Sequence, residues 1–207
     1  MTKLPLLLLL LLTYTSAIAA PNLAQIIAQT RQNGLSLEGH GTMQTKNKGK
    51  TLTWNLSIHP TSTTLQYCAS NAIALQRLSI PDSTNSLTQP FAESDFWYCD
   101  LSLDFLHWKN QVLLPNPTKL KRGRAYFLLQ STGDSTTIYS KVLTWLDQET
   151  SGIIAAETYD QNGKLLKTFE PKSFQKIEGQ WQVKQVEIRN VQTHSSTTIT
   201  LDPTTKP

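Results

Sequence analysis

Apolar and polar residues alternate over much of the chain with a period of two, the pattern of β-strands that bury one face. In the N-terminal half, segments 35–38 and 51–58 alternate in this way on either side of the polar turn 46–49, which predicts a β-hairpin. A third strand is predicted at 63–67. The N-terminal half is therefore expected to begin a sheet of antiparallel strands.

The C-terminal half has the pattern of a run of hairpins, because turn-forming sequences separate several of its apolar segments. An antiparallel meander of about ten strands must curl to limit its exposed edges. We therefore predict a mainly β (α+β) domain, an open, strongly curved antiparallel β-barrel or half-barrel. The strands predicted in this half are 124–130, 136–146, 153–159, 165–169, 174–177, 181–191 and 197–201.

Helical periodicity is confined to two short segments. Asn22 can cap a first helix that presents one apolar face and ends at Gly34. The polar, proline-containing stretch 79–95 is predicted to be a long surface loop, and Asp100 after it can cap a second helix. The first helix should bury Leu23, Ile26, Ile27 and Thr30, and the second carries an apolar stripe of Leu101, Phe105 and Trp108 at i, i+4 and i+7.

The first residues have the pattern of a signal peptide: Lys3, seven leucines at 6–12, a polar stretch and then alanine at 17 and 19. The apolar run is much shorter than the ~18–20 residues that a membrane span needs. We therefore expect a signal peptide at 1–19, a single domain at 20–207 and export to the periplasm.

Charge gives no support for nucleic-acid binding. Of 19 basic residues one, Lys3, lies in the expected signal peptide, and 15 acidic residues oppose the others. The surplus is too small to favour nucleic acid. One locally dense basic run, at Lys119, Lys121, Arg122 and Arg124, is expected to be a solvated turn, with attraction to anionic lipid head groups as the alternative.

The chain contains none of the common catalytic signatures. Residues 49–51 resemble the end of a phosphate-binding loop, but Gln44 stands where glycine is required and a strand pattern follows. Asp100 and Asp104 fit capping and solvation better than acid–base catalysis. The four histidines lack the spacing of metal ligands. We therefore expect no enzyme activity, no cofactor and no bound metal.

Cys68 and Cys99 are the two cysteines of a chain expected to reach an oxidising compartment. An even number of cysteines permits one disulfide there. The alternative is a pair of buried free thiols.

Three stretches, at 100–108, 121–129 and 139–191, resemble the outer-membrane lipoprotein-sorting protein family, to which the periplasmic carrier LolA belongs. They read DLSLDFLHW, KRGRAYFLL and a long passage from YSKVLTWLD to VEIRNV. Their strongest common feature is the order of elements: a strand ending in WLD, a strand ending in tyrosine, a D-x-N-G-K turn and a strand opened by G-x-W. The resemblance covers about Leu23 to Leu201.

The resemblance implies a LolA/LolB-like open barrel with helices over its mouth and an apolar cavity between. It further implies a carrier that binds the acyl chains of a lipoprotein or other lipid and ferries them toward the outer membrane. The chain lacks the lipobox cysteine of receptor relatives and the second domain of regulator relatives, so a carrier ranks first. The alternatives are a lipid-sensing or protein-interaction module that works with a membrane transporter, and a secreted hydrolase.

The expected partners follow from this function. They are acyl chains or another lipid, with an inner-membrane transporter as a further candidate. No nucleic acid and only transient membrane contact are expected, and the chain should be a monomer. The resemblance also implies an arginine that holds the lid, but the stretch after Leu35 that would contain it has none.

The candidate ligand contacts are apolar and aromatic side chains, which also form the ordinary core of β proteins. The face of each strand that points inward cannot be assigned without the register. First choices for the cavity are Leu52, Trp54 and Leu56, and for the lid Leu101, Phe105 and Trp108; Tyr67, Phe127 and Trp145 complete the set.

Overall fold

The computed structural model describes residues 22–32, 39–58, 64–67, 76–79, 87–91, 93–115, 120–177 and 179–202. The expected signal peptide and segment 33–38 lie outside these ranges. No helix within them is long and apolar enough to cross a bilayer.

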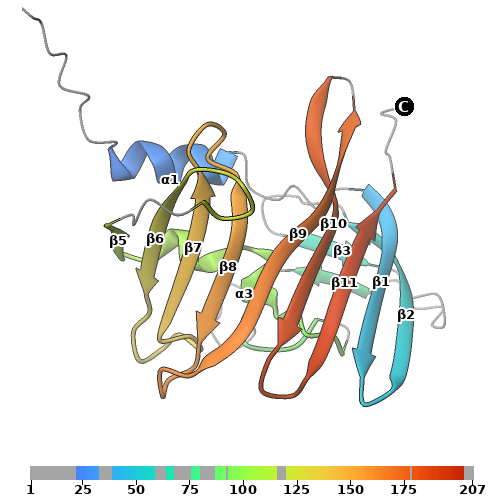
Figure 1. The fold of residues 1–207 in the computed structure, drawn as a ribbon. Coiled ribbons are helices and arrows are strands. Elements are labelled where there is room, and N and C mark those ends of the chain that lie inside the picture. Colours follow the sequence, from blue (N-terminus) through green and yellow to red (C-terminus); the bar gives the residue numbers. More distant parts are fainter. Residues whose placement is uncertain are drawn as a thin grey trace, which may run out of the picture.

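Nine antiparallel strands form one curled, open sheet in the order β2-β1-β11-β10-β9-β8-β7-β6-β5 (Figure 1). Two further strands, β3 (Thr64–Tyr67) and β4 (Gln76–Ser79), pair with each other. The sheet consists of β1 (Gly39–Asn47), β2 (Lys50–Ile58), β5 (Asn110–Leu114), β6 (Tyr126–Thr132), β7 (Lys141–Asp147), β8 (Ile153–Tyr159), β9 (Leu165–Ile177), β10 (Gln180–Asn190) and β11 (Ser195–Leu201). The predicted mainly β, open and curved architecture is confirmed.

The first helix, α1 (Leu23–Gln32), agrees with its prediction. The Asn22 side chain accepts a hydrogen bond from the backbone N–H of Ala24 at 3.0 Å, which caps the helix. Its predicted inner face is buried at Ile26, Ile27 and Thr30.

The predicted hairpin is present as β1 and β2, but β1 covers residues 39–47, which show little apolar alternation; the predicted segment 35–38 lies outside the described residues. At Gly41 this strand leaves no room for a side chain, because an added Cβ would lie 2.1 Å from the backbone oxygen of Thr200 on β11. The two-residue turn to β2 has positive φ at Lys48 and Gly49, the geometry of a tight hairpin turn.

The segment after β4 corrects two predictions. Of the predicted surface loop 79–95, residues 80–86 and 92 lie outside the described residues; Phe91, Ser94 and Asp95 are buried instead of exposed, and so is Phe96 directly after them. Instead of one helix, two short ones follow, α3 (Tyr98–Leu101) and the 3₁₀ helix η1 (Asp104–His107). The break comes at Leu103, whose left-handed backbone (φ 51°) no regular helix accommodates.

We call residues 87–91 and 93–109 the cover segment. In Figure 1 its green ribbon, including α3, lies behind the sheet. Its apolar side chains form one core with residues of β1 and of β6 to β11. The face of the sheet that contributes to this core is called the inner face below.

Candidate functional site

The inner face is an apolar floor under the cover segment. Cross-strand pairs such as Met43 with Ile199, Ile188 with Phe169 and Phe169 with Ala156 align buried residues across neighbouring strands. From the cover, the Phe96 ring meets the Phe169 ring edge-to-face at 6.4 Å. The buried floor residues are Met43, Leu129, Val142, Leu146, Ala156, Phe169, Val186, Ile188 and Ile199, and those of the cover are Phe91, Phe96, Tyr98, Leu103, Phe105 and Leu106.

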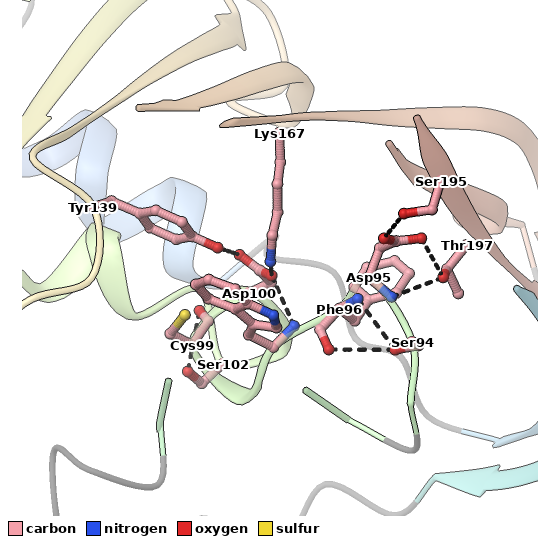
Figure 2. Close-up of polar contacts among 11 residues, drawn as sticks. Ser94, Asp95, Phe96, Cys99, Asp100, Ser102, Tyr139, Lys167, Ser195 and Thr197 are labelled. Carbon is pink, nitrogen blue, oxygen red and sulfur yellow. Dashed lines mark hydrogen bonds and ion pairs between the residues drawn. The ribbon is translucent and has the colours of Figure 1, made fainter. Parts of the chain in front are cut away.

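A buried ion pair connects the cover to the centre of this floor. The Lys167 ammonium on β9 lies 2.8 Å from the Asp100 carboxylate on α3, and both side chains are almost completely inaccessible (Figure 2). Asp100 also accepts hydrogen bonds from the Tyr139 hydroxyl at 2.7 Å and from the Trp97 backbone N–H at 2.8 Å. The predicted solvated capping role of Asp100 is therefore incomplete: the carboxylate caps α3 but lies in the core.

Two aromatic rings complete the environment of the Lys167 charge. Its ammonium lies 3.6 Å from the centre of the Trp97 ring, close enough for a cation–π interaction. The Trp97 ring stacks on the Tyr139 ring at 5.7 Å with an interplanar angle of 1°. Burial, together with the adjacent Asp100 charge, raises the pKa of Tyr139 well above its usual value, so the hydroxyl remains a donor.

A second polar contact holds the cover at β11. The Asp95 carboxylate accepts hydrogen bonds from the hydroxyls of Ser195 and Thr197, and the Asp95 backbone N–H donates to Thr197 at 2.9 Å (Figure 2). The Thr45 hydroxyl on β1 lies 3.0 Å from that of Thr197, which extends the network to a third element. The cover is thus attached to the floor by carboxylates as well as by apolar packing.

A third contact joins the cover to α1. The Arg31 guanidinium donates to the backbone oxygen of Leu106 from Nη2 at 2.5 Å and from Nε at 3.2 Å. An arginine that contacts the cover is therefore present, but it is Arg31, which precedes Leu35 instead of following it.

The space between cover and floor is nearly filled. A mostly apolar cavity of about 40 Å³ lies between Cys99, Phe105, Trp108 and Tyr139. A more open and polar cleft of about 220 Å³ lies at the Asp95 end, lined among others by Trp97 and Asn190. Both are smaller than the roughly 300–1,000 Å³ of typical small-molecule pockets. With the cover in this position, the apolar cavity of about 40 Å³ is too small for an acyl chain.

The three predicted lid residues all lie at the cover. Phe105 is buried, and Leu101 and Trp108 are partly buried against the same core. The Trp108 indole N–H donates to Asp104 at 2.8 Å. They do not share one helical stripe, because α3 ends before η1 begins.

The predicted cavity residues do not all lie on the inner face. Phe127 packs partly buried against the core. Trp145 alternates with the buried Thr144 and Leu146 and lies on the opposite face, where the Lys121 ammonium is 4.2 Å from its ring centre. Leu52 is 44% exposed. Trp54 and Leu56 pair in register with Met43 and Gly41, and Tyr67 with Gln76, but their side chains lie outside the described structure.

Three residues of the dense basic run, Lys121, Arg122 and Arg124, form intramolecular contacts, and Lys119 lies outside the described residues. Besides Lys121, Arg124 pairs with Asp147 and Glu149, and Arg122 donates to the backbone oxygen of Pro171. Lys121 and Arg124 bridge across a tight turn, as predicted for this run.

Cys99 is a free, buried thiol beside the cover cavity, and its expected partner Cys68 lies outside the described residues. The disulfide therefore stays a prediction. Burial raises the pKa of the Cys99 thiol far above its ordinary value, so labelling of the native protein would be slow in any case. Labelling of the exported protein after denaturation without reductant should detect no thiol if the disulfide forms; two labelled thiols per chain would exclude it.

Comparison with solved structures identifies proteins of similar architecture. An outer membrane lipoprotein-sorting protein domain from Vibrio parahaemolyticus matches with a TM-score of 0.63 and 23% identity, over 86% of this chain and 89% of the other. A DUF1329 family protein from Desulfovibrio piger matches with a TM-score of 0.63 and 17% identity, over 87% and 91%. A LolA superfamily protein from Nitrosomonas europaea matches with a TM-score of 0.58 and 18% identity, over 90% and 96%.

The curled open sheet with its few covering helices is thus the fold of the LolA superfamily, as the sequence resemblance implied. A family model with the description "Uncharacterized protein" matches residues 75–205, and the chain belongs to that family. A search of curated proteins gave no match.

Proposed function

We propose that this protein is a periplasmic carrier that holds the acyl chains of a lipoprotein or other lipid between the inner face and the cover segment, and that it performs no catalysis. The observation that carries the proposal is the apolar floor, built from seven strands, which forms one core with the cover segment and α1. The LolA-superfamily fold supports the same function.

Cargo binding on this floor requires the cover to move, because the present cavity of about 40 Å³ is too small. Opening the cover separates Lys167 from Asp100, but both charges then regain their hydration, which offsets much of the lost attraction. Burial of an acyl chain contributes about 0.8 kcal/mol for each methylene, or on the order of 10 kcal/mol for about a dozen. An acyl chain bound on the inner face therefore replaces part of the apolar burial that is lost when the cover opens.

Absence of catalysis is part of the proposal because the ionisable groups beneath the cover bind one another. With the cover closed, Lys167, Asp100 and Tyr139 bond to one another and are inaccessible to water and substrate. A proton-transferring group must come within hydrogen-bond distance of a substrate. Here, with the cover closed, other protein groups already occupy the hydrogen-bonding positions around Lys167, Asp100 and Tyr139.

The direct test is lipid analysis of the protein purified from a periplasm, by native mass spectrometry and by extraction, followed by displacement of a fluorescent acyl probe. We expect a co-purified lipid and a probe that long-chain lipids displace. If no lipid co-purifies and no long-chain lipid displaces the probe, the carrier function is rejected. Turnover on a substrate panel, or capture of a protein partner without lipid, would favour the hydrolase or the interaction module in its place.

Trp108→Ala should weaken retention of the acyl probe more than it lowers the melting temperature. Trp108 is only partly buried at the edge of the cover, and a segment that opens for cargo belongs to the less stable part of a structure. Trp145→Ala on the opposite face is the matched control and should leave probe retention unchanged. Large destabilisation by Trp108→Ala with normal probe binding would assign Trp108 to the core alone.

A further inference from the structure

The β9–β10 hairpin projects beyond the rest of the sheet. The pairing of β8 with β9 ends at Phe169, and that of β10 with β11 begins at Gln185. Between these limits the two strands pair only with each other among the described strands, and in Figure 1 the orange hairpin rises above its neighbours. A two-stranded ribbon with no third strand is marginally stable in water. The side chains on its surface therefore indicate what it contacts.

The projecting part carries the most exposed aromatic side chains of the described residues. Trp181 is 72% exposed and Phe174 is 53% exposed. Phe174 pairs directly with Val183, and Trp181 lies two residues before Val183, so the three share one face of the hairpin. Val183 packs against the core cluster. The exposed rings therefore extend the apolar core out of the molecule.

Basic side chains surround these rings. Residues 172–184 contain three lysines and one glutamate. Lys176, opposite Trp181 in the register, and Lys184 are both exposed, whereas Lys172 is paired with Glu170 and Glu187. Arg122, exposed in its own loop, donates to the backbone oxygen of Pro171 and so adds a charge at the hairpin base, next to the 64% exposed Leu120.

We propose that the tip of the β9–β10 hairpin is a membrane-docking element that inserts Trp181 and Phe174 into the interface of an anionic lipid bilayer. Tryptophan is favoured at this interface because its ring is apolar and its N–H is polar. Lysines beside it can place their stems along the apolar region and their charges at lipid phosphates. The proposal does not depend on the identity of the cargo or on the movement of the cover.

The size of the patch favours a bilayer over a folded protein partner. A stable protein interface buries about 800 Å² on each side, or roughly 20–30 residues. A narrow ribbon with two exposed rings offers much less, whereas interfacial insertion needs only a few apolar side chains combined with favourable charge.

The test is co-sedimentation of the full mature chain with vesicles of phosphatidylcholine alone and of phosphatidylcholine mixed with phosphatidylglycerol. We expect binding to the mixed vesicles that falls with added salt, and a weakening by about tenfold or more in the double variant Phe174→Ser/Trp181→Ser. Val112→Ser, at a 47% exposed apolar position on β5, is the control and should bind as the unaltered chain does. Both rings are exposed, so circular dichroism and the melting temperature should not change.

Three results would overturn the proposal: no binding to mixed vesicles, equal binding by the double variant, or a dimer that the double variant abolishes. The last would assign the rings to a contact between two copies. The acyl-probe assay separates this proposal from the carrier function, since the double variant should retain the probe even when vesicle binding is lost.

Discussion

Lys167→Met should lower the free energy of unfolding by about 3–5 kcal/mol, since it leaves the Asp100 carboxylate buried without its counter-charge. The methionine fills most of the lysine's volume. The loss of stability therefore reflects the unpaired Asp100 charge and not a cavity. Asp100 would keep the donors Tyr139 and Trp97, which stabilise the charge only in part. The measurement is urea denaturation followed by circular dichroism.

Lys172→Met is the matched control, the same substitution in the same strand. Lys172 pairs with Glu170 and Glu187 at the surface, where ion pairs contribute about 0–1 kcal/mol. The double variant Lys167→Met/Asp100→Leu should be more stable than Lys167→Met, because no charge remains unpaired. A loss below about 1 kcal/mol for Lys167→Met would show that the pair is not closed in solution.

Phe96→Ala should also cost about 3–5 kcal/mol, the usual range for removing a fully buried phenylalanine. The ring packs against Phe169, so its removal loosens the cover at the centre of the floor. Phe174→Ala is the control, because the same change at an exposed site usually alters stability by less than about 0.5 kcal/mol.

Hydrogen exchange would show which part of the molecule loses stability in Phe96→Ala. Backbone amides of the cover, including the Phe91 N–H that donates to the Phe96 oxygen, should exchange faster, while those of β10 and β11 should change less. Equal stability of the Phe96 and Phe174 variants would mean that the cover does not pack on the floor in solution.

Local sequence patterns predicted most strands of the curved sheet, because nearby residues signal them, but they did not predict β5 (Asn110–Leu114) or place β1 at Gly39–Asn47. Strand β8 has the predicted limits, since turn-forming residues precede and follow it. Strand β9 was predicted as two pieces, 165–169 and 174–177, and Pro171 lies between them. In the structure it continues through Pro171, where irregular pairing with β10 accommodates a residue that cannot donate.

The buried polar contacts escaped prediction for a different reason. Lys167 lies two residues from Phe169, so the alternation placed its side chain on the same face as an apolar ring, a signal that was present and not used. Its partner Asp100 is 67 positions away, and no local pattern relates the two. The same holds for Asp95, which is 100 and 102 positions from its partners Ser195 and Thr197.

The position of β1 between β2 and β11 has a consequence for the order of assembly. The hairpin β1–β2 is local and can form early, but its inner neighbour β11 lies near the end of the chain, so that Thr45 meets Thr197 across 152 positions. Such non-local pairing is slow, on a scale of milliseconds to seconds. Until β11 arrives, β1 presents an unpaired edge that a strand of another chain could occupy. The interval between synthesis of the first hairpin and of the last strand is therefore when this protein is most exposed to strand exchange and aggregation.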